Sequence, residues 1–141
     1  MNPRALLRSA CAFALLSVAI ATARADVVVV VAANSPIRNL TTAEIADIYL
    51  GRLTRLPDGT RPIPIDRPED SPLREELYEK VARLSPVQVK AHWSRLIFTG
   101  RGRPPRAVAS DEAVLRILRE NPAAIGYIDR RSATEAVRIL D

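Results

Sequence analysis

Short apolar runs separated by polar segments predict four β-strands. Residues 27–31 are five consecutive valines, and a β-branched run of this length is typical of a strand buried on both faces. Residues 63–65 and 124–128 are two further apolar runs, and residues 137–140 have the pattern of an edge strand. Gly126 lies inside the third run, where the missing side chain allows a helix or a ligand to approach closely. We expect either a β-bulge or close packing against a helix there.

Polar N-cap residues between these runs predict helix starts. Thr41–Glu44 and Ser85–Gln88 are capping boxes, and Ser71 precedes a proline, which favours the first helical position. Ser110 and Ser132 mark two more starts. The positions expected to face inward are apolar residues at helical spacing: Ile45, Ile48, Tyr49, Leu73, Leu77, Val81, Leu84, Val89, Trp93, Leu96, Ile97, Val114, Ile117 and Leu118. Alternating strands and helices predict an α/β domain, in which helices flank a small mixed sheet.

The first 25 residues have the features of a secretory signal peptide. Arg4 and Arg8 precede an apolar stretch at residues 10–23, and Ala23–Ala25 forms an A-x-A cleavage pattern. The apolar stretch is too short for a membrane span. We therefore expect a periplasmic or secreted protein whose single mature domain comprises residues 26–141.

The predicted cleavage changes the charge and the cysteine content. It removes Arg4, Arg8 and Arg24, so 18 of the 21 basic residues and all 16 acidic residues remain, a net charge of +2. It also removes Cys11, the one cysteine of the sequence. A nearly neutral mature chain gives little reason to expect a nucleic-acid or membrane partner. Without cysteine, the mature chain has no disulfide and no thiolate metal site.

Residues that could carry chemistry are few. His92 is the only histidine, and the sequence lacks the common patterns for a catalytic nucleophile, a nucleotide phosphate or a zinc ion. We therefore expect no enzyme activity, no metal and no cofactor. Arg101, Arg103 and Arg106 form a basic loop that could contact nucleic acid or anionic lipid, but no aromatic residues are interleaved with them. We interpret this loop as a solvated segment.

The segment 63–76 is the strongest candidate for a binding site. It contains a strand, a tight polar turn and a helix that starts after Ser71. The free N–H groups and the positive dipole end of a helix start suit an anion, and Arg67 and Arg74 flank this start with guanidinium groups. The alternative is an ordinary capped helix with surface charges, because residues 66–76 contain five acidic residues and only two basic ones.

The order of several segments resembles the phosphate-type periplasmic substrate-binding protein family, which has the type 2 periplasmic binding protein fold. These segments are residues 40–51, 57–59, 63–74, 93–100 and 121–127. The resemblance covers nearly the whole predicted mature chain. Proteins of this family have two α/β lobes that close on a ligand, and this chain resembles the second lobe alone.

The resemblance also implies site residues. In the family, an arginine on the turn and a Ser-Gly-Thr sequence at the helix start bind phosphate. Arg67 matches the arginine and Ser71 matches the serine, so the resemblance implies that both bind the ligand, with Arg74 in support. Pro72 stands in place of the glycine and Leu73 in place of the threonine. These differences remove one backbone N–H donor and one hydroxyl.

Two functional hypotheses follow. The first is a periplasmic or secreted solute-binding module for phosphate or another oxyanion, linked to ABC-type phosphate uptake or sensing, with a second copy of the chain or another protein completing the cleft. The alternative is a protein–protein interaction module without a small-molecule ligand. This alternative predicts an exposed apolar patch near Leu73, Tyr127 and the hinge strands.

Overall fold

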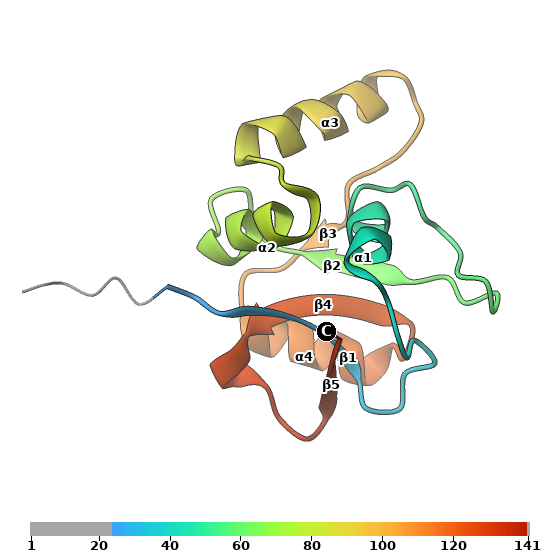
Figure 1. Cartoon of the computed structure of the whole chain (residues 1–141), viewed down its shortest axis with the longest axis vertical. Helices are drawn as coiled ribbons and strands as arrows, with labels where there is room; N and C mark the ends of the chain where they lie inside the picture. Colours follow the sequence, from blue (N-terminus) through green and yellow to red (C-terminus); the bar gives the residue numbers. More distant parts are fainter. Residues whose placement is uncertain (1–23, 141) are drawn as a thin grey trace, which may run out of the picture.

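Five strands form one mixed sheet in the computed structural model, which describes residues 24–140 (Figure 1). The strands are β1 (Val27–Ala32), β2 (Ile63–Asp66), β3 (Arg106–Ala107), β4 (Ala124–Asp129) and β5 (Val137–Leu140). Four α-helices accompany them in this part of the chain: α1 (Thr42–Tyr49), α2 (Pro72–Ala82), α3 (Pro86–Phe98) and α4 (Asp111–Glu120). The predicted α/β fold with a small mixed sheet flanked by helices is therefore confirmed.

The predicted signal peptide lies outside the described residues, except for Arg24 and Ala25. The signal peptide at residues 1–25 therefore remains a prediction from the sequence. None of the helices within residues 24–140 is long and apolar enough to cross a bilayer.

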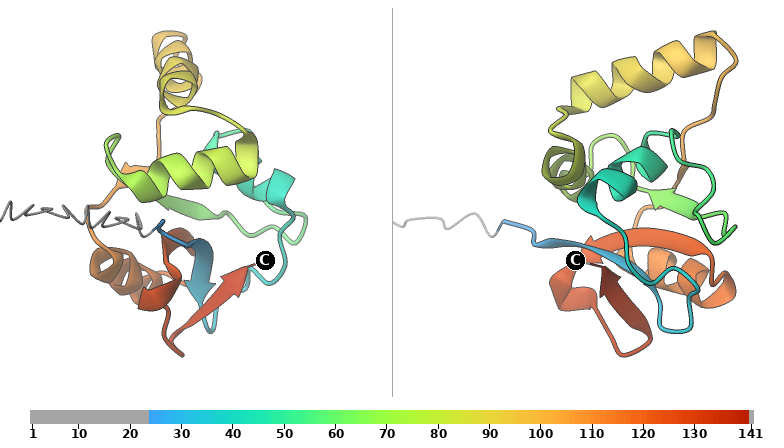
Figure 2. Two further views of the ribbon diagram at one scale, coloured as in Figure 1. Left: turned by 60° about the vertical axis from the view of Figure 1, so that its left-hand side comes forward. Right: turned by 45° about the vertical axis from the view of Figure 1, so that its right-hand side comes forward.

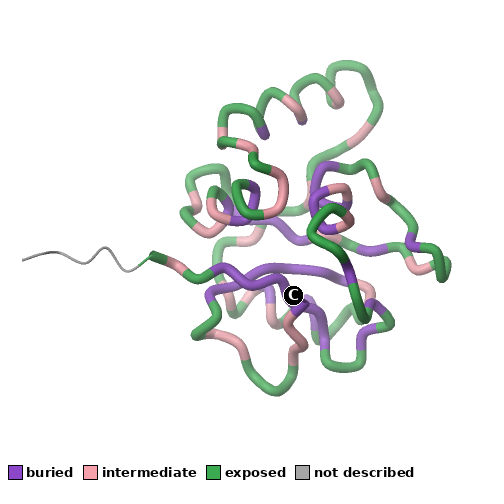
Figure 3. Tube along the Cα trace, viewed as in Figure 1, coloured by how far each residue is buried: buried purple, intermediate pink, exposed green. Residues whose placement is uncertain are grey.

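The two fully buried strands, β1 and β4, form the centre of the sheet, whose order is β3-β2-β4-β1-β5. β1 runs antiparallel to β4 and to β5, whereas β2 runs parallel to β4 and to β3. Every residue of β1 and β4 is buried (Figure 3). The prediction that the valine run is buried on both faces is confirmed.

Different helices cover the two faces of the sheet (Figure 2). Val27, Val29 and Val31 pack in one apolar cluster with residues of α1, α2 and α3. Val28 and Val30 pack in a second cluster with residues of α4. Since strand side chains alternate between faces, helices on both sides leave β1 without a polar face. Figures 1 and 2 show that α3 is the outermost element, on the far side of α1 and α2 from the sheet.

Four of the predicted helix starts are confirmed. Thr41, Ser71, Ser85 and Ser110 are N-caps, and each side chain accepts a hydrogen bond from the backbone N–H three residues later. Thr41 and Ser85 complete capping boxes with the side chains of the residues at the third helical position. These caps satisfy N–H groups that a helix start would otherwise leave unpaired.

The predicted last helix after Ser132 is wrong. The chain forms only a 3-10 turn at Arg130–Ser132, where the Asp129 side chain accepts the Arg131 N–H. The chain then enters β5, whose residues pair with β1. Pairing with a central strand therefore prevails over the local capping pattern. The strand predicted at residues 137–140 is confirmed, and β3 is a short strand where the sequence predicts a loop.

The predicted burial of α3 is only partly correct. Val89 and Trp93 are buried and Leu96 is half-buried, but Ile97 is 55% exposed. Since α3 lies outside the other helices, only a narrow stripe of its surface meets the domain. Leu84 lies beyond the end of α2, which stops at the left-handed backbone of Arg83 (φ 56°), but its side chain is half-buried and packs against the core as predicted.

Gly126 packs against α4, which is one of the two alternatives that the sequence predicts. A Cβ atom built on Gly126 would lie 2.5 Å from Val114 Cγ1, closer than real side chains come. The glycine is therefore needed for the close approach of β4 and α4.

Candidate functional site

The turn between β2 and α2 brings the three predicted anion-binding residues together, and Arg67 is the deepest of them. It directly follows the last residue of β2, and its side chain is only 4% exposed. Its guanidinium group donates a hydrogen bond to the carboxylate of Asp111, the first residue of α4, and a longer one of 3.4 Å to the carbonyl of Tyr127. The charge of Arg67 is therefore already matched by a carboxylate of the same chain.

Arg74 also has a carboxylate partner. Its Nε donates to Asp66 Oδ2 at 3.2 Å, and its guanidinium carbon lies 5.0 Å from the centre of the Tyr78 ring. Asp66 is buried and accepts three more hydrogen bonds, from the hydroxyls of Tyr78 and Tyr127 and from the backbone N–H of Arg67. These contacts make Asp66 the centre of a buried polar network in which each donor has the same acceptor.

Ser71 uses its polar groups within the turn. Its Oγ accepts the N–H of Arg74 at 3.4 Å, and its own N–H donates to the carbonyl of Pro68 at 3.0 Å. Pro72, the next residue, has no N–H to offer. The structure thus places Arg67, Ser71 and Arg74 at one turn, but every one of them has a partner inside the domain.

The three tyrosines at positions 49, 78 and 127, which we call the tyrosine cluster, surround this network. Tyr49 contacts both other rings in edge-to-face geometry, with ring centres 6.3 and 5.7 Å apart. Its hydroxyl donates to the carbonyls of Ile65 and Ile125, each at 3.2 Å. Burial raises the pKa of each of the three tyrosines, and the nearby Asp66 carboxylate raises each pKa further. The three hydroxyls therefore remain protonated hydrogen-bond donors.

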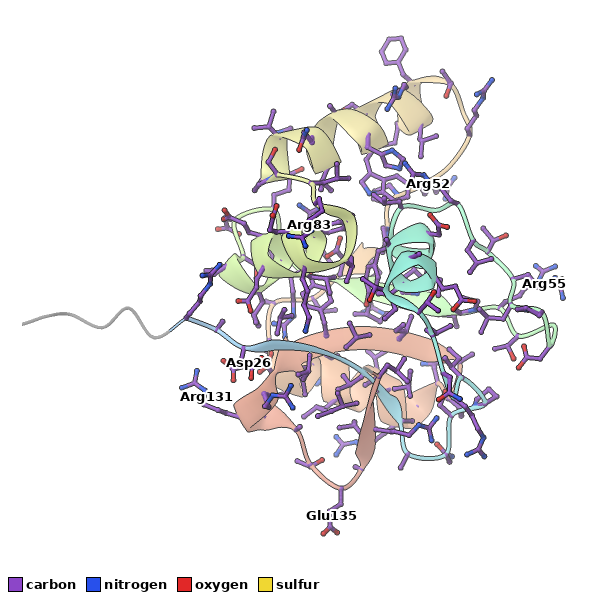
Figure 4. All side chains as sticks on the ribbon, viewed as in Figure 1. Asp26, Arg52, Arg55, Arg83, Arg131 and Glu135 are labelled. Carbon is purple, nitrogen blue, oxygen red and sulfur yellow. The ribbon has the colours of Figure 1, made fainter. Side chains whose placement is uncertain are left out.

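A second group of ion pairs lies on the side of the domain away from α3. Arg131 donates two hydrogen bonds to the Asp129 carboxylate from its side chain and one from its backbone, and these lower the Asp129 pKa to about 2. Arg130 pairs with Asp26 at 2.7 Å. Figure 4 shows Asp26 and Arg131 at this edge of the domain. Within residues 24–140, no group of three or more His, Cys, Asp or Glu side chains is placed to hold a metal ion.

The chain is similar to an ABC-type phosphate transport receptor from Vibrio cholerae, with a TM-score of 0.63 and 19% identity over 83% of this chain and 46% of the receptor. It is also similar to a putative phosphate ABC transporter substrate-binding protein with bound phosphate from Clostridium perfringens, with a TM-score of 0.64 and 19% identity over 83% and 44% of the two chains. The chain has the fold of one lobe of a PstS-type binding protein.

The chain is also similar to PstS from Borrelia burgdorferi, with a TM-score of 0.57 and 16% identity over 83% of this chain and 47% of PstS. The chain thus spans about half the length of these solved proteins. No family model matches the sequence, and no curated protein matches it. At these identities the likeness shows the fold alone.

The sequence did not reveal the partners of the two arginines. Asp111 is 44 positions away from Arg67 and reads as an ordinary acidic residue in the first turn of a helix. Asp66 reads as one of several acids near the turn, although it follows an apolar run directly. That position at the carboxyl end of a buried strand is the one signal that could have marked Asp66 as buried.

The prediction of an exposed apolar patch near Leu73 and Tyr127 is wrong, because Tyr127 is fully buried and Leu73 is half-buried. In the described part of the chain, the exposed large apolar residues lie elsewhere: Ile63, Val87, Ile97 and Phe98. Three of these four belong to α3. The surface with the most exposed apolar side chains is therefore on the outermost helix and not at the predicted anion site.

Proposed function

We propose that this PstS-type lobe is a docking module that binds a macromolecular partner through its surface and does not depend on a small-molecule ligand. The observation that carries this proposal is the pairing of both candidate anion-binding arginines with carboxylates of the same domain. Arg67 contacts Asp111, and Arg74 contacts Asp66. The four side chains together have no net charge.

A free oxyanion has to compete with Asp111 for Arg67. Breaking a buried ion pair costs about 3–5 kcal/mol when one charge is left uncompensated. Each 1.4 kcal/mol is a factor of ten in the dissociation constant, so a cost of about 4 kcal/mol weakens binding roughly a thousandfold. A ligand of micromolar intrinsic affinity would then bind only at about millimolar concentration.

The second candidate function is weak binding of phosphate or another oxyanion by Arg67, Ser71 and Arg74. Two observations support it. Nε of Arg67 is buried and has no hydrogen-bond partner in the structure, so one donor of this guanidinium is still unused. The similar protein from Clostridium perfringens was solved with bound phosphate.

Calorimetric titration of inorganic phosphate decides between the two functions. We expect no heat of binding at phosphate concentrations well below millimolar from the wild-type protein, from Arg67→Ala or from the control Arg61→Ala, which replaces an exposed arginine. A saturable heat in the wild type and in Arg61→Ala that disappears in Arg67→Ala would refute the docking proposal and support oxyanion binding.

We also infer a periplasmic or secreted location, since residues 1–25 have the pattern of a signal peptide. Mass spectrometry of the protein isolated from its own cells tests this inference. The expected amino terminus is Asp26, and an intact chain that begins at Met1 in the cytoplasmic fraction would contradict it.

A further inference from the structure

Helix α3 contacts the domain along a narrow stripe. Val89 and Trp93 are its two buried residues, and both belong to the apolar cluster shared with α1 and α2. All three views in Figures 1 and 2 show α3 apart from the sheet, with its outer side facing away from the rest of the domain. Most of the helix surface is therefore available to a partner.

The outward side of α3 has a stripe of its own, with a large apolar residue at each end. Val87, Ala91, Ser94 and Phe98 follow one another at spacings of four, three and four residues, which places them on one side of a helix. This side is opposite to Val89 and to the rest of the buried stripe. Val87 is 77% exposed and Phe98 is 95% exposed. No other helix or strand of the described residues lies over the outer side of α3 in Figures 1 and 2.

Positive charge surrounds this stripe. The segment from residue 80 to residue 110 contains no aspartate and no glutamate, and it contains seven basic residues: Lys80, Arg83, Lys90, Arg95, Arg101, Arg103 and Arg106. Within residues 24–140, Lys90 pairs with Glu69 and Arg83 with Glu79, and both of these pairs are exposed. Arg95, Arg101 and Arg103 form no ion pair with any described residue.

We propose that the outward side of α3, together with the basic loop that follows it, binds the surface of a lipid bilayer rich in anionic phospholipid. This inference rests on the proposed docking function and names its partner. Phe98 enters the boundary between headgroups and acyl chains, and Arg95, Arg101 and Arg103 lie among the lipid phosphates. A helix with exposed apolar residues and flanking basic residues is the usual pattern of interfacial membrane binding.

The shape of the surface favours a bilayer over a protein partner. Phe98 projects from the end of a protruding helix, so a partner must accommodate it without help from a hollow in this domain. The free arginines come from the helix and from the loop after it, and they present charge of one sign without any acid between them. A broad anionic plane complements this arrangement, since each basic residue close to such a surface strengthens binding about fivefold.

Vesicle co-sedimentation with the full-length protein tests the proposal. The probes are phosphatidylcholine vesicles and vesicles with roughly 30 mol% phosphatidylglycerol, in salt of about 0.1 M, where exposed charges still act over roughly 10 Å. We expect binding to the anionic vesicles only. The double variant Arg95→Gln/Arg101→Gln should weaken the affinity for anionic vesicles about 25-fold. The control variant Arg116→Gln/Arg119→Gln removes two exposed arginines from α4, on the other face of the sheet. It should change this affinity less than about twofold.

Phe98 supplies the second test. Phe98→Ala should weaken binding to the anionic vesicles about tenfold, and Phe98→Trp should restore it because tryptophan favours the membrane interface. Phe98 is almost fully exposed, so circular dichroism should show the same fold for all three proteins. An unchanged affinity in Phe98→Ala, or equal binding to neutral and anionic vesicles, would overturn the proposal.

The two proposals fail in different ways. If the protein binds neither vesicles nor phosphate, the lipid proposal is overturned while the docking function stands, and a protein partner becomes the explanation for the surface of α3. If phosphate binds through Arg67, the docking function is refuted. Loss of vesicle binding in salt of about 0.5 M, where screening acts within a few ångströms, would further support the electrostatic part of the proposal.

Discussion

Replacing Asp111 by alanine should convert the lobe into a protein whose stability depends on phosphate. The substitution removes the carboxylate that contacts Arg67 and leaves the guanidinium group without a counter-charge at a position only 4% exposed. An added oxyanion would then replace the lost carboxylate. The wild-type protein, in which Asp111 fills this role, should not respond to phosphate.

The size of the effect follows from the burial of the pair. Loss of one partner from a buried ion pair costs about 3–5 kcal/mol, and the 20% exposure of the Asp111 side chain places this pair near the lower end. A loss of about 3 kcal/mol should lower the melting temperature by roughly 12 °C in a domain of this size. Phosphate at a hundred times its dissociation constant should return about 2.7 kcal/mol.

Thermal unfolding with increasing phosphate measures both effects. Glu112→Gln is the matched control, because Glu112 also lies in the first turn of α4, near the positive end of the helix dipole, but it does not contact Arg67. Glu112→Gln should cost less than about 1 kcal/mol and should not respond to phosphate. An Asp111→Ala protein as stable as the wild type, or one with the same indifference to phosphate, would refute the idea that Asp111 acts as the internal counter-ion of Arg67.

Three further predictions concern the rest of the domain. The tyrosine cluster should show no tyrosinate absorbance until the protein unfolds in alkali, because the pKa of each tyrosine is raised in the folded state. The free energy of unfolding should therefore be unaffected below about pH 10 and should fall above it by up to about 1.4 kcal/mol per pH unit for each tyrosine. Tyrosinate absorbance from folded protein would contradict this prediction. Gly126→Ala should cost about 1–3 kcal/mol in denaturant titrations, and the cost should shrink in the presence of Val114→Ala if contact with Val114 causes it. The hydrogen bonds from Arg131 lower the Asp129 pKa from 3.8 to about 2, so their stabilisation is complete above about pH 4 and is lost as the pH falls through 2. Asp129→Asn should remove this part of the acid dependence, and an identical acid profile would show that the ion pair does not stabilise the fold.

The sequence predicts the local elements of the candidate site but not the partners of its arginines. The strand, the turn and the helix start around Ser71 were predictable because each depends on neighbouring residues: an apolar run, a cap and a proline. The same pattern correctly places Arg67 and Arg74 at one turn. Their partners were not predictable from neighbouring residues, because Asp111 approaches Arg67 from a helix that the chain reaches 44 residues later.

The sequence by itself determined the elements whose cause is local. The valine run favoured a doubly covered strand, and the caps at Thr41, Ser71, Ser85 and Ser110 favoured helix starts, since backbone donors and apolar side chains have few other ways to be satisfied. Only the tertiary structure decided which charges are free. In the folded domain, Asp111 and Asp66 pair with the two arginines of the turn. The outer side of α3 remains uncovered because that helix meets the domain along a single stripe.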